Sequence, residues 1–167
     1  MELLTPSTLA LATVGEDLAP HVASVYFVTD DRFNLYFFSD PLSQHGLDLV
    51  HTPQAAVAIY PEAYGWQEIR GLQMRGEARP VAARVVWEAA WERYAAKFPF
   101  VMELQQVVAQ NQLYEFIPDW MRLVDNARGF GYKAEWVRRK DSGEAEDPGS
   151  AWQAIDPGAP VTGGEGG

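Results

Sequence analysis

The fold is decided by the stretch Phe33-Asn-Leu-Tyr-Phe-Phe-Ser-Asp-Pro-Leu-Ser-Gln-His45 and the short segment that follows it to His51. Its apolar and aromatic first part predicts a strand, which Asp40-Pro41 ends. Ser43-Gln44-His45 then predicts a turn that opens a short helix. Hydroxyl groups, free backbone N–H groups and one imidazole are therefore expected where a strand meets a helix N-terminus.

This strand-to-helix turn is a candidate anion site. The first N–H groups of a helix have no intrahelical acceptor, and the helix dipole adds positive potential, so both favour a phosphate. Ser39, Ser43, Gln44 and His45 supply side chains that could hold it. These residues leave a second interpretation open, in which Ser43 serves only as the N-cap of the helix.

Composition predicts one globular domain. The chain has 167 residues, of which 47% are hydrophobic and 13% aromatic. The absence of cysteine excludes a disulfide scaffold, a thiolate metal site and a cysteine nucleophile. No apolar run approaches the length of a membrane span, and the first residues lack the basic start of a signal peptide, so we expect a cytoplasmic protein with no membrane partner.

The formal net charge of −10 is unevenly distributed. Residues 141–167 carry six acidic side chains and no basic one, which leaves 17 acidic against 13 basic residues in 1–140. Nothing resembles the basic surface of a nucleic-acid-binding protein, so nucleic acid is not an expected partner. We expect a folded domain over residues 1–140 and a poorly packed, acidic, Gly/Pro-rich tail over 141–167, in which Trp152 and Ile155 are the only apolar anchors.

The remaining pattern is mainly β with inserted helices, an α+β class. Pro20–Thr29 and its two neighbours in sequence predict an antiparallel meander, and Gly71 and Gly76 predict bulges or close backbone approach within a long strand. Together the segments predict a small antiparallel β-barrel with six or seven strands. The other expected strands are Thr8–Val14, Gln54–Tyr60, Ile69–Val81, Tyr114–Ile117, Trp120–Val124 and Lys133–Trp136, and the expected helices are Ala82–Phe98 and Glu103–Gln112.

Signatures of catalysis are scarce. The three histidines, His21, His45 and His51, show no metal-ligand spacing, and no P-loop, dinucleotide-binding or nucleophile-elbow motif is present. No metal site is expected and no catalytic residue is assigned. Binding chemistry remains: Gln73 and Arg75 share one strand face with Gly71. Aromatic side chains could flank a planar ring or pack as ordinary core residues, and these are Tyr26, Trp66, Trp120 and Phe130.

Three segments resemble the pyridoxamine 5′-phosphate oxidase-like, FMN-binding split-barrel proteins, and within them a small bacterial subfamily of uncharacterised members. The segments are Ser43-Gln-His45 followed by Pro53-Gln-Ala-Ala-Val57, then Ile69-Arg-Gly-Leu-Gln-Met-Arg-Gly-Glu77, and Asp125-Asn-Ala-Arg-Gly-Phe-Gly131 leading to Trp136. The resemblance spans roughly residues 5–140. It implies a homodimer of six-stranded antiparallel split barrels that binds FMN at the subunit interface.

The resemblance also implies which residues bind the cofactor. The FMN phosphate would lie at Ser39, Ser43, Gln44 and His45. The flavin ring would lie against the strand that carries Ser24, Val25 and Tyr26, and the strand from Gly71 to Gln73 would border it. The partner's C-terminal strands, near Trp120, Asn126 and Phe130, would complete the pocket.

Two departures from the family pattern affect the expected function. Oxidase members commonly place a Lys near the position of His45 and an Arg near that of Ala23, and a basic C-terminal motif is not visible here. Phosphate binding should therefore weaken as pH rises past about 6.5. These departures argue against true pyridoxamine-phosphate oxidase activity.

The resulting hypothesis is an FMN-dependent oxidoreductase of unknown substrate, and the alternative is a non-catalytic, stress-associated dimer that binds flavin or haem. A deazaflavin is a further alternative cofactor.

Overall fold

A computed structural model describes residues 2–139 and 148–156 of the protein, which is built from antiparallel strand pairs. Within these residues nine strands form one sheet, more than the six or seven that were predicted, and the predicted class, mainly β with inserted helices, is confirmed. The strands are β1 Thr8–Val14, β2 Pro20–Tyr26, β3 Val28–Thr29, β4 Leu35–Ser39, β5 Gln54–Ile59, β6 Arg70–Pro80, β7 Gln112–Asp125, β8 Lys133–Arg138 and β9 Trp152–Ile155. The helices are α1 Gln44–His51, α2 Arg84–Lys97 and α3 Gln105–Ala109.

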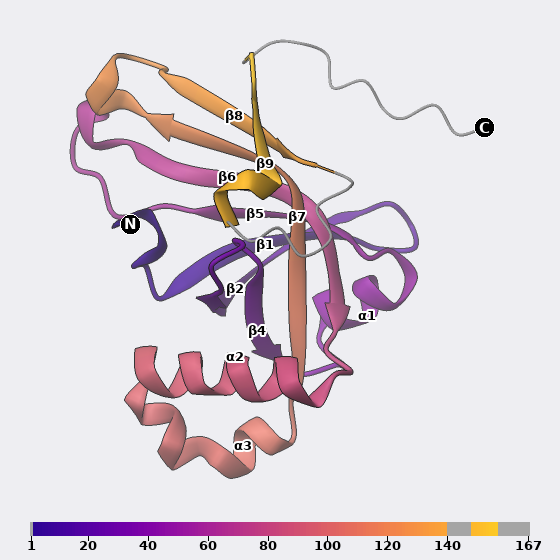
Figure 1. Ribbon diagram of the computed structural model, residues 1–167. Coiled ribbons are helices and arrows are strands. Elements are labelled where there is room, and N and C mark those ends of the chain that lie inside the picture. The colour runs from indigo at the N-terminus through magenta and orange to yellow at the C-terminus, as the bar shows by residue number, and fades with distance from the viewer. Residues whose placement is uncertain (1, 140–147, 157–167) are drawn as a thin grey trace.

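The sheet curls back on itself because its two end strands are consecutive in the chain. The strand order is β2-β1-β5-β6-β7-β4-β3, and β8 and β9 extend it beyond β7. Only Phe27, which is fully buried, separates β2 from β3. The predicted single strand Pro20–Thr29 is therefore wrong in detail, because its two halves pair with β1 and with β4 respectively. Figure 1 shows the resulting curved sheet.

The core fills the inside of this curve. Leu11, Phe27, Leu35, Phe37 and Phe116 are each 0% exposed. Leu11 belongs to β1, Leu35 and Phe37 belong to β4 and Phe116 belongs to β7, while Phe27 lies between β2 and β3. In β1, buried and more exposed residues alternate, which places one face of the strand inward. Strand propensity and packing therefore agree, since most of these buried residues are aromatic or branched.

Helix α2 lies on one side of the barrel with α3 (Figure 1). Tyr94 in α2 and Phe98, which follows its last residue, are buried. The Tyr94 hydroxyl donates to the carbonyl oxygen of Tyr26 at 2.6 Å. Phe38 packs edge-on against the Tyr94 ring at 5.1 Å between centroids. The predicted helix Glu103–Gln112 is wrong in extent, because only α3 forms there, after a 3₁₀ segment from Pro99 to Leu104.

Lys97, at the end of α2, ties the helix to the point where the sheet closes. Its ammonium group donates to the carbonyl oxygens of Leu4, Pro6 and Phe27 at 3.2, 2.8 and 3.1 Å. It also lies 4.0 Å from the centroid of the Phe27 ring, a cation–π distance. Burial lowers the pKa of Lys97 to about 8. One side chain thus joins the N-terminal segment, the β2–β3 break and α2.

Strand β7 corrects one further expectation and confirms another. It is one continuous strand where two were predicted, and it passes Pro118 where the β6–β7 register shifts beside Gly76. A Cβ atom on Gly76 would collide with the carbonyl oxygen of Ile117, so this glycine allows the close approach that the sequence predicted.

Among the described residues, no helix is long and apolar enough to cross a membrane.

The predicted tail is partly wrong. Trp152–Ile155 forms β9, which pairs antiparallel with β8, and Trp152 is buried at 9% exposure. A poorly packed tail is therefore excluded for residues 148–156, and Trp152 is the apolar anchor that was expected. Residues 140–147 and 157–167 lie outside the described part of the chain.

Candidate functional site

The turn between β4 and α1 brings three of the four predicted phosphate ligands together. His45 Nε2 lies 2.5 Å from Ser39 Oγ and 3.1 Å from Ser43 Oγ. Ser43 is also the N-cap of α1, since its Oγ accepts from the Gly46 N–H at 3.3 Å and donates to the Asp40 carbonyl at 2.6 Å. The N-cap interpretation of Ser43 is therefore confirmed, and its role at an anion site stays a prediction.

Gly46 makes the turn this tight. A Cβ atom at this position would lie 2.6 Å from the Pro41 carbonyl oxygen, so any larger residue would push α1 away from the end of β4. Gly46 was not among the predicted site residues. The sequence feature that could have indicated its role is a glycine in the first turn of the predicted helix, where glycine is otherwise unfavourable.

Burial of the imidazole lowers the pKa of His45, and the carboxylates of Asp48 and Asp40 oppose this effect only in part. The ring is therefore uncharged at neutral pH. An anion at this turn would be held by two hydroxyl groups, a neutral imidazole and backbone N–H groups of α1, all of them dipoles rather than fixed charges.

Gln44 takes part in a different site. Its amide donates to Asp48 Oδ1 at 2.9 Å, one helical turn later. Asp48 is 2% exposed, and its Oδ2 accepts from Thr13 Oγ1 at 2.7 Å and contacts His21 Nδ1 at 2.8 Å. Burial acts to raise the pKa of Asp48, but the hydrogen bonds from Thr13, Gln44 and His21 outweigh it, so the pKa lies below its ordinary value.

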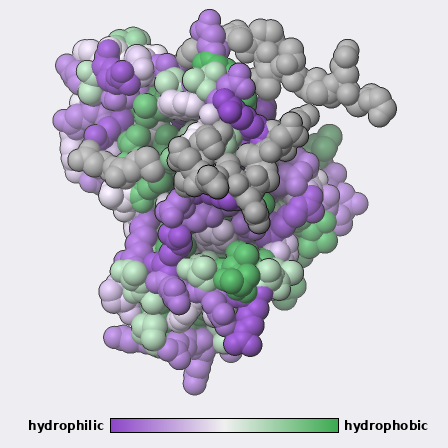
Figure 2. Space-filling model, viewed as in Figure 1, coloured by the Kyte–Doolittle hydropathy of each residue, from purple (hydrophilic) through white to green (hydrophobic). Residues whose placement is uncertain are grey.

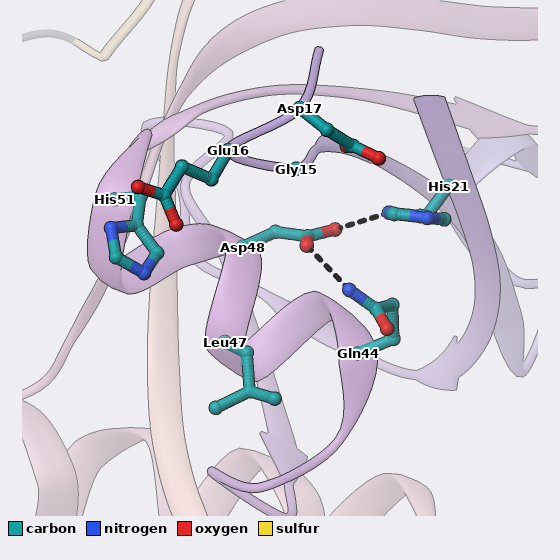
Figure 3. Close-up of a pocket in the computed structure, with 8 residues that line it drawn as sticks. All are labelled: Gly15, Glu16, Asp17, His21, Gln44, Leu47, Asp48 and His51. Atoms are coloured by element: carbon teal, nitrogen blue, oxygen red, sulfur yellow. Dashed lines mark hydrogen bonds and ion pairs between the residues drawn. The ribbon is translucent and has the colours of Figure 1, made fainter. Parts of the chain in front are cut away.

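This Asp48 network forms the wall of a cavity of about 550 Å³ beside α1 (Figure 3). Because Nδ1 of His21 engages the carboxylate, a neutral His21 keeps its other ring nitrogen, Nε2, as a hydrogen-bond acceptor. This cavity was not predicted from the sequence, because no local motif encodes it. Its lining residues are Gly15, Glu16, Asp17, His21, Gln44, Leu47, Asp48 and His51.

The three predicted residues of β2 point in different directions. Val25 is 7% exposed and its side chain packs in the core, so a ligand on this strand would meet its backbone rather than its side chain, and the predicted contact stays a prediction. Ser24 is exposed on the opposite face. Tyr26 is 51% exposed, and its ring packs edge-on against Phe98 and Phe100.

Ser24 and Gln73 mark the two ends of a row of small residues across the outer face of the sheet. Ser24 pairs with Ala10, Ala10 with Ala58, and Ala58 with Gln73. Residues paired in this way share a face, and three strand spacings put Ser24 about 14 Å from Gln73. The alanines between them leave this face flat.

Gly71 lies near the Gln73 end of this face. A Cβ atom on Gly71 would lie 2.6 Å from the Ile59 carbonyl oxygen, so this glycine serves close strand packing. Gly71 and Gln73 also line a cavity of about 180 Å³.

The predicted residues at the far end of β7 are mostly engaged within their own chain. Trp120 Nε1 donates to Glu135 at 3.1 Å, and the Arg122 guanidinium lies 4.8 Å from the Trp120 ring centroid. The Asn126 amide donates to the Trp66 carbonyl at 2.8 Å and accepts from the Gly131 N–H at 3.0 Å, so it shapes the loop. Phe130 is 84% exposed, and its ring packs edge-on against Trp66 with 5.7 Å between the ring centroids.

The structure thus separates the predicted residues into a turn group, Ser39, Ser43 and His45, and a sheet-face group around Ser24, Gly71 and Gln73. Within the described residues, no group of three or more His, Asp and Glu side chains is arranged to hold a metal ion.

Comparisons with known proteins agree on the fold. A family model described as pyridoxamine 5′-phosphate oxidase matches residues 2–125. A UPF0306 protein of Cronobacter sakazakii is 31% identical over 130 residues, which cover 77% of this chain and 86% of that protein.

Two solved structures show the same architecture at low sequence identity. A pyridoxamine 5′-phosphate oxidase-related, FMN-binding protein of Nostoc punctiforme superimposes with a TM-score of 0.63 at 16% identity, covering 93% of this chain and 90% of that one. The haem storage protein HutZ of Vibrio cholerae superimposes with a TM-score of 0.59 at 19% identity, covering 67% of this chain and 81% of that one. The curled sheet is therefore a split barrel of the kind that the sequence predicted.

Proposed function

The chain belongs to the pyridoxamine 5′-phosphate oxidase family, and from this membership we propose that it is an FMN-dependent oxidoreductase that works as a homodimer. The observation that carries the proposal is the convergence of Ser39, Ser43 and His45 at the N-terminus of α1. Hydroxyl groups, an imidazole and helix N–H groups in one place provide a neutral cradle for a phosphate. The cytoplasm is the proposed location.

The outer sheet face supports the second half of the proposal. The row from Ser24 to Gln73 is flat enough to lie against a flavin ring, and the ring would have solvent on its other side in a single chain. A second copy would cover that side, which is why we propose the homodimer. Exposed apolar side chains on β2 fit such a cover, since Val22 is 72% and Tyr26 51% exposed.

FMN bound here would supply hydride or electron transfer, and the protein would bind, orient and shield it. Ser39, Ser43 and His45 would hold the phosphate, and the Ser24–Gln73 row would position the ring. Two fixed cations of the family pattern are missing, so the affinity would rest on hydrogen bonds more than on charge.

Non-catalytic haem or flavin storage is the second candidate. It is supported by the haem storage protein HutZ, which shares the fold, and by the missing cations at His45 and Ala23. A Soret band in the purified or haem-loaded protein, with no reduction of FMN by NADH or NADPH, would favour this candidate over the oxidoreductase.

The decisive experiment compares FMN with riboflavin, which lacks the phosphate. His45→Ala should weaken FMN binding about tenfold, because it removes a phosphate hydrogen bond, and should leave riboflavin binding nearly unchanged. Flavin fluorescence quenching measures both affinities. His51→Ala, at the other end of α1, is the matched control and should change neither. The proposal fails if micromolar FMN causes no quenching in the native protein, or if His45→Ala affects both ligands equally.

A further inference from the structure

An apolar cavity of about 470 Å³ shares no residue with the turn group, the sheet-face group or the Asp48 cavity. It lies where β9 crosses the end of the barrel, against the N-terminal 3₁₀ turn Glu2–Leu4. Its lining includes Leu3, Met121, Trp136, Trp152 and Ala154, and no charged side chain is part of it. In the space-filling view, hydrophobic surface gathers over the strands beside β9 (Figure 2).

The cavity exists because a large residue faces a small one across the sheet. Met121 pairs with Trp136 and Trp136 pairs with Ala154, so these three residues stand in one row on the same face. The methyl group of Ala154 leaves space beside the Trp136 indole that a larger side chain would fill. The volume falls within the range of small-molecule sites, which runs from about 300 to 1,000 Å³.

The opposite wall is held rigidly. Trp152 packs edge-on against Phe33, with ring centroids 6.2 Å apart, and the Arg138 guanidinium lies 5.1 Å from its ring centroid. Arg138 in turn donates to the Arg32 carbonyl and to Asn34 Oδ1, at 2.8 and 2.9 Å, which fixes the loop that carries Phe33. The cavity is therefore formed before any ligand arrives.

Phe33 itself adopts an uncommon backbone conformation. Its φ of 65° lies in the left-handed region, which a bulky residue rarely occupies. Asp30 Oδ1 holds the loop in this shape by accepting from the backbone N–H groups of Arg32 and Asn34 at 2.9 Å each. The strained position brings the Phe33 ring to the cavity and against Trp152, an arrangement typical of ligand contacts.

We propose that this cavity binds a neutral, planar ring compound, independently of any flavin. Two indoles and a phenyl ring line it and favour a flat apolar body through stacking and edge contacts. A charged group would lose its hydration there, and no charged side chain lines the cavity to replace it, so an ionised analogue should bind far more weakly.

The test uses the neutral naphthalene dye Prodan, whose emission shifts to shorter wavelength in apolar surroundings. The native protein should bind it, and Ala154→Phe should weaken binding at least about tenfold by filling the space. Gln153→Phe is the matched control, because neighbouring residues of a strand face opposite sides and the same bulk then lies outside the cavity. It should leave the affinity within about twofold.

Five results would overturn the proposal. The first is that the native protein takes up no Prodan, and the second is that anilinonaphthalene sulfonate, its anionic relative, binds as tightly. Equal effects of Ala154→Phe and Gln153→Phe would place the dye elsewhere. Displacement of Prodan by FMN would place the dye in the flavin site. A change in oligomeric mass on Ala154→Phe, measured by light scattering, would mean that a second copy of the chain occupies the cavity.

Discussion

Helix α1 separates two polar sites that differ in how the chain builds them. At its N-terminus, Ser39, Ser43 and His45 meet within six residues of one another. Along its side, Asp48 meets Thr13 and His21, which are 35 and 27 residues away. The first site needs only a local turn. The second needs the β1–β2 hairpin to dock on the helix, so it forms only when the barrel closes.

The difference predicts that the Asp48 cluster matters more for stability than the turn does. Asp48→Ala should lower the free energy of unfolding by about 3 kcal/mol, because it leaves the buried Thr13 hydroxyl without its acceptor and also removes the acceptor of the more exposed Gln44 and His21. Urea denaturation followed by circular dichroism measures this value. Glu16→Ala, at the exposed rim of the same cavity, should change it by no more than about 0.5 kcal/mol.

Equal losses for Asp48→Ala and Glu16→Ala would show that the network around Asp48 does not stabilise the fold. The difference between a local and a long-range site would then not be reflected in the free energy of unfolding.

The same contrast explains what could be predicted from the sequence. The Ser43 turn and the Gly76 contact follow from neighbouring residues and from strand periodicity, so both were predicted. The pairing of His21 with Asp48 depends on where two distant segments dock, and no spacing rule encodes that. The burial of the Val25 side chain could not be foreseen, because a resemblance names a strand segment but does not say which of its side chains face the core.

The fold shows the same limit at its closing points. The break at Phe27 divides an apolar run that has no Gly, Pro or turn signal inside it, so one long strand was the natural prediction. Strand β9 is short and lies in an acidic, Gly- and Pro-rich context, which predicted poor packing. Its anchor, Trp152, gains its partners Phe33 and Arg138 only in three dimensions.

The turn should show a smaller but measurable effect. Ser43→Ala removes the N-cap of α1, which costs about 1 kcal/mol in the free energy of unfolding. The same urea denaturation detects it, with the exposed Ser7→Ala as the matched control. A loss as large as that of Asp48→Ala would break the comparison, because it would mean that the local turn carries as much stability as the long-range cluster.

The smallest expected effect is a pH dependence that comes from His45. Burial lowers its pKa in the folded state, so at pH values below the ordinary value of about 6.5 the unfolded chain binds more protons than the folded one. Stability should therefore fall as pH drops below this value and level off once the folded histidine is protonated too.

His45→Gln removes this contribution, so the difference in unfolding free energy between the native protein and the variant should shrink or reverse toward acid pH. Asp48 acts in the same direction, because its own lowered pKa makes its contribution disappear on acidification. It is present in both proteins, however, and cancels in the difference. A difference that stays constant from pH 7.5 to 5 would mean that His45 is not desolvated at the turn. The proposed phosphate site would then contain a charged imidazole rather than a neutral one.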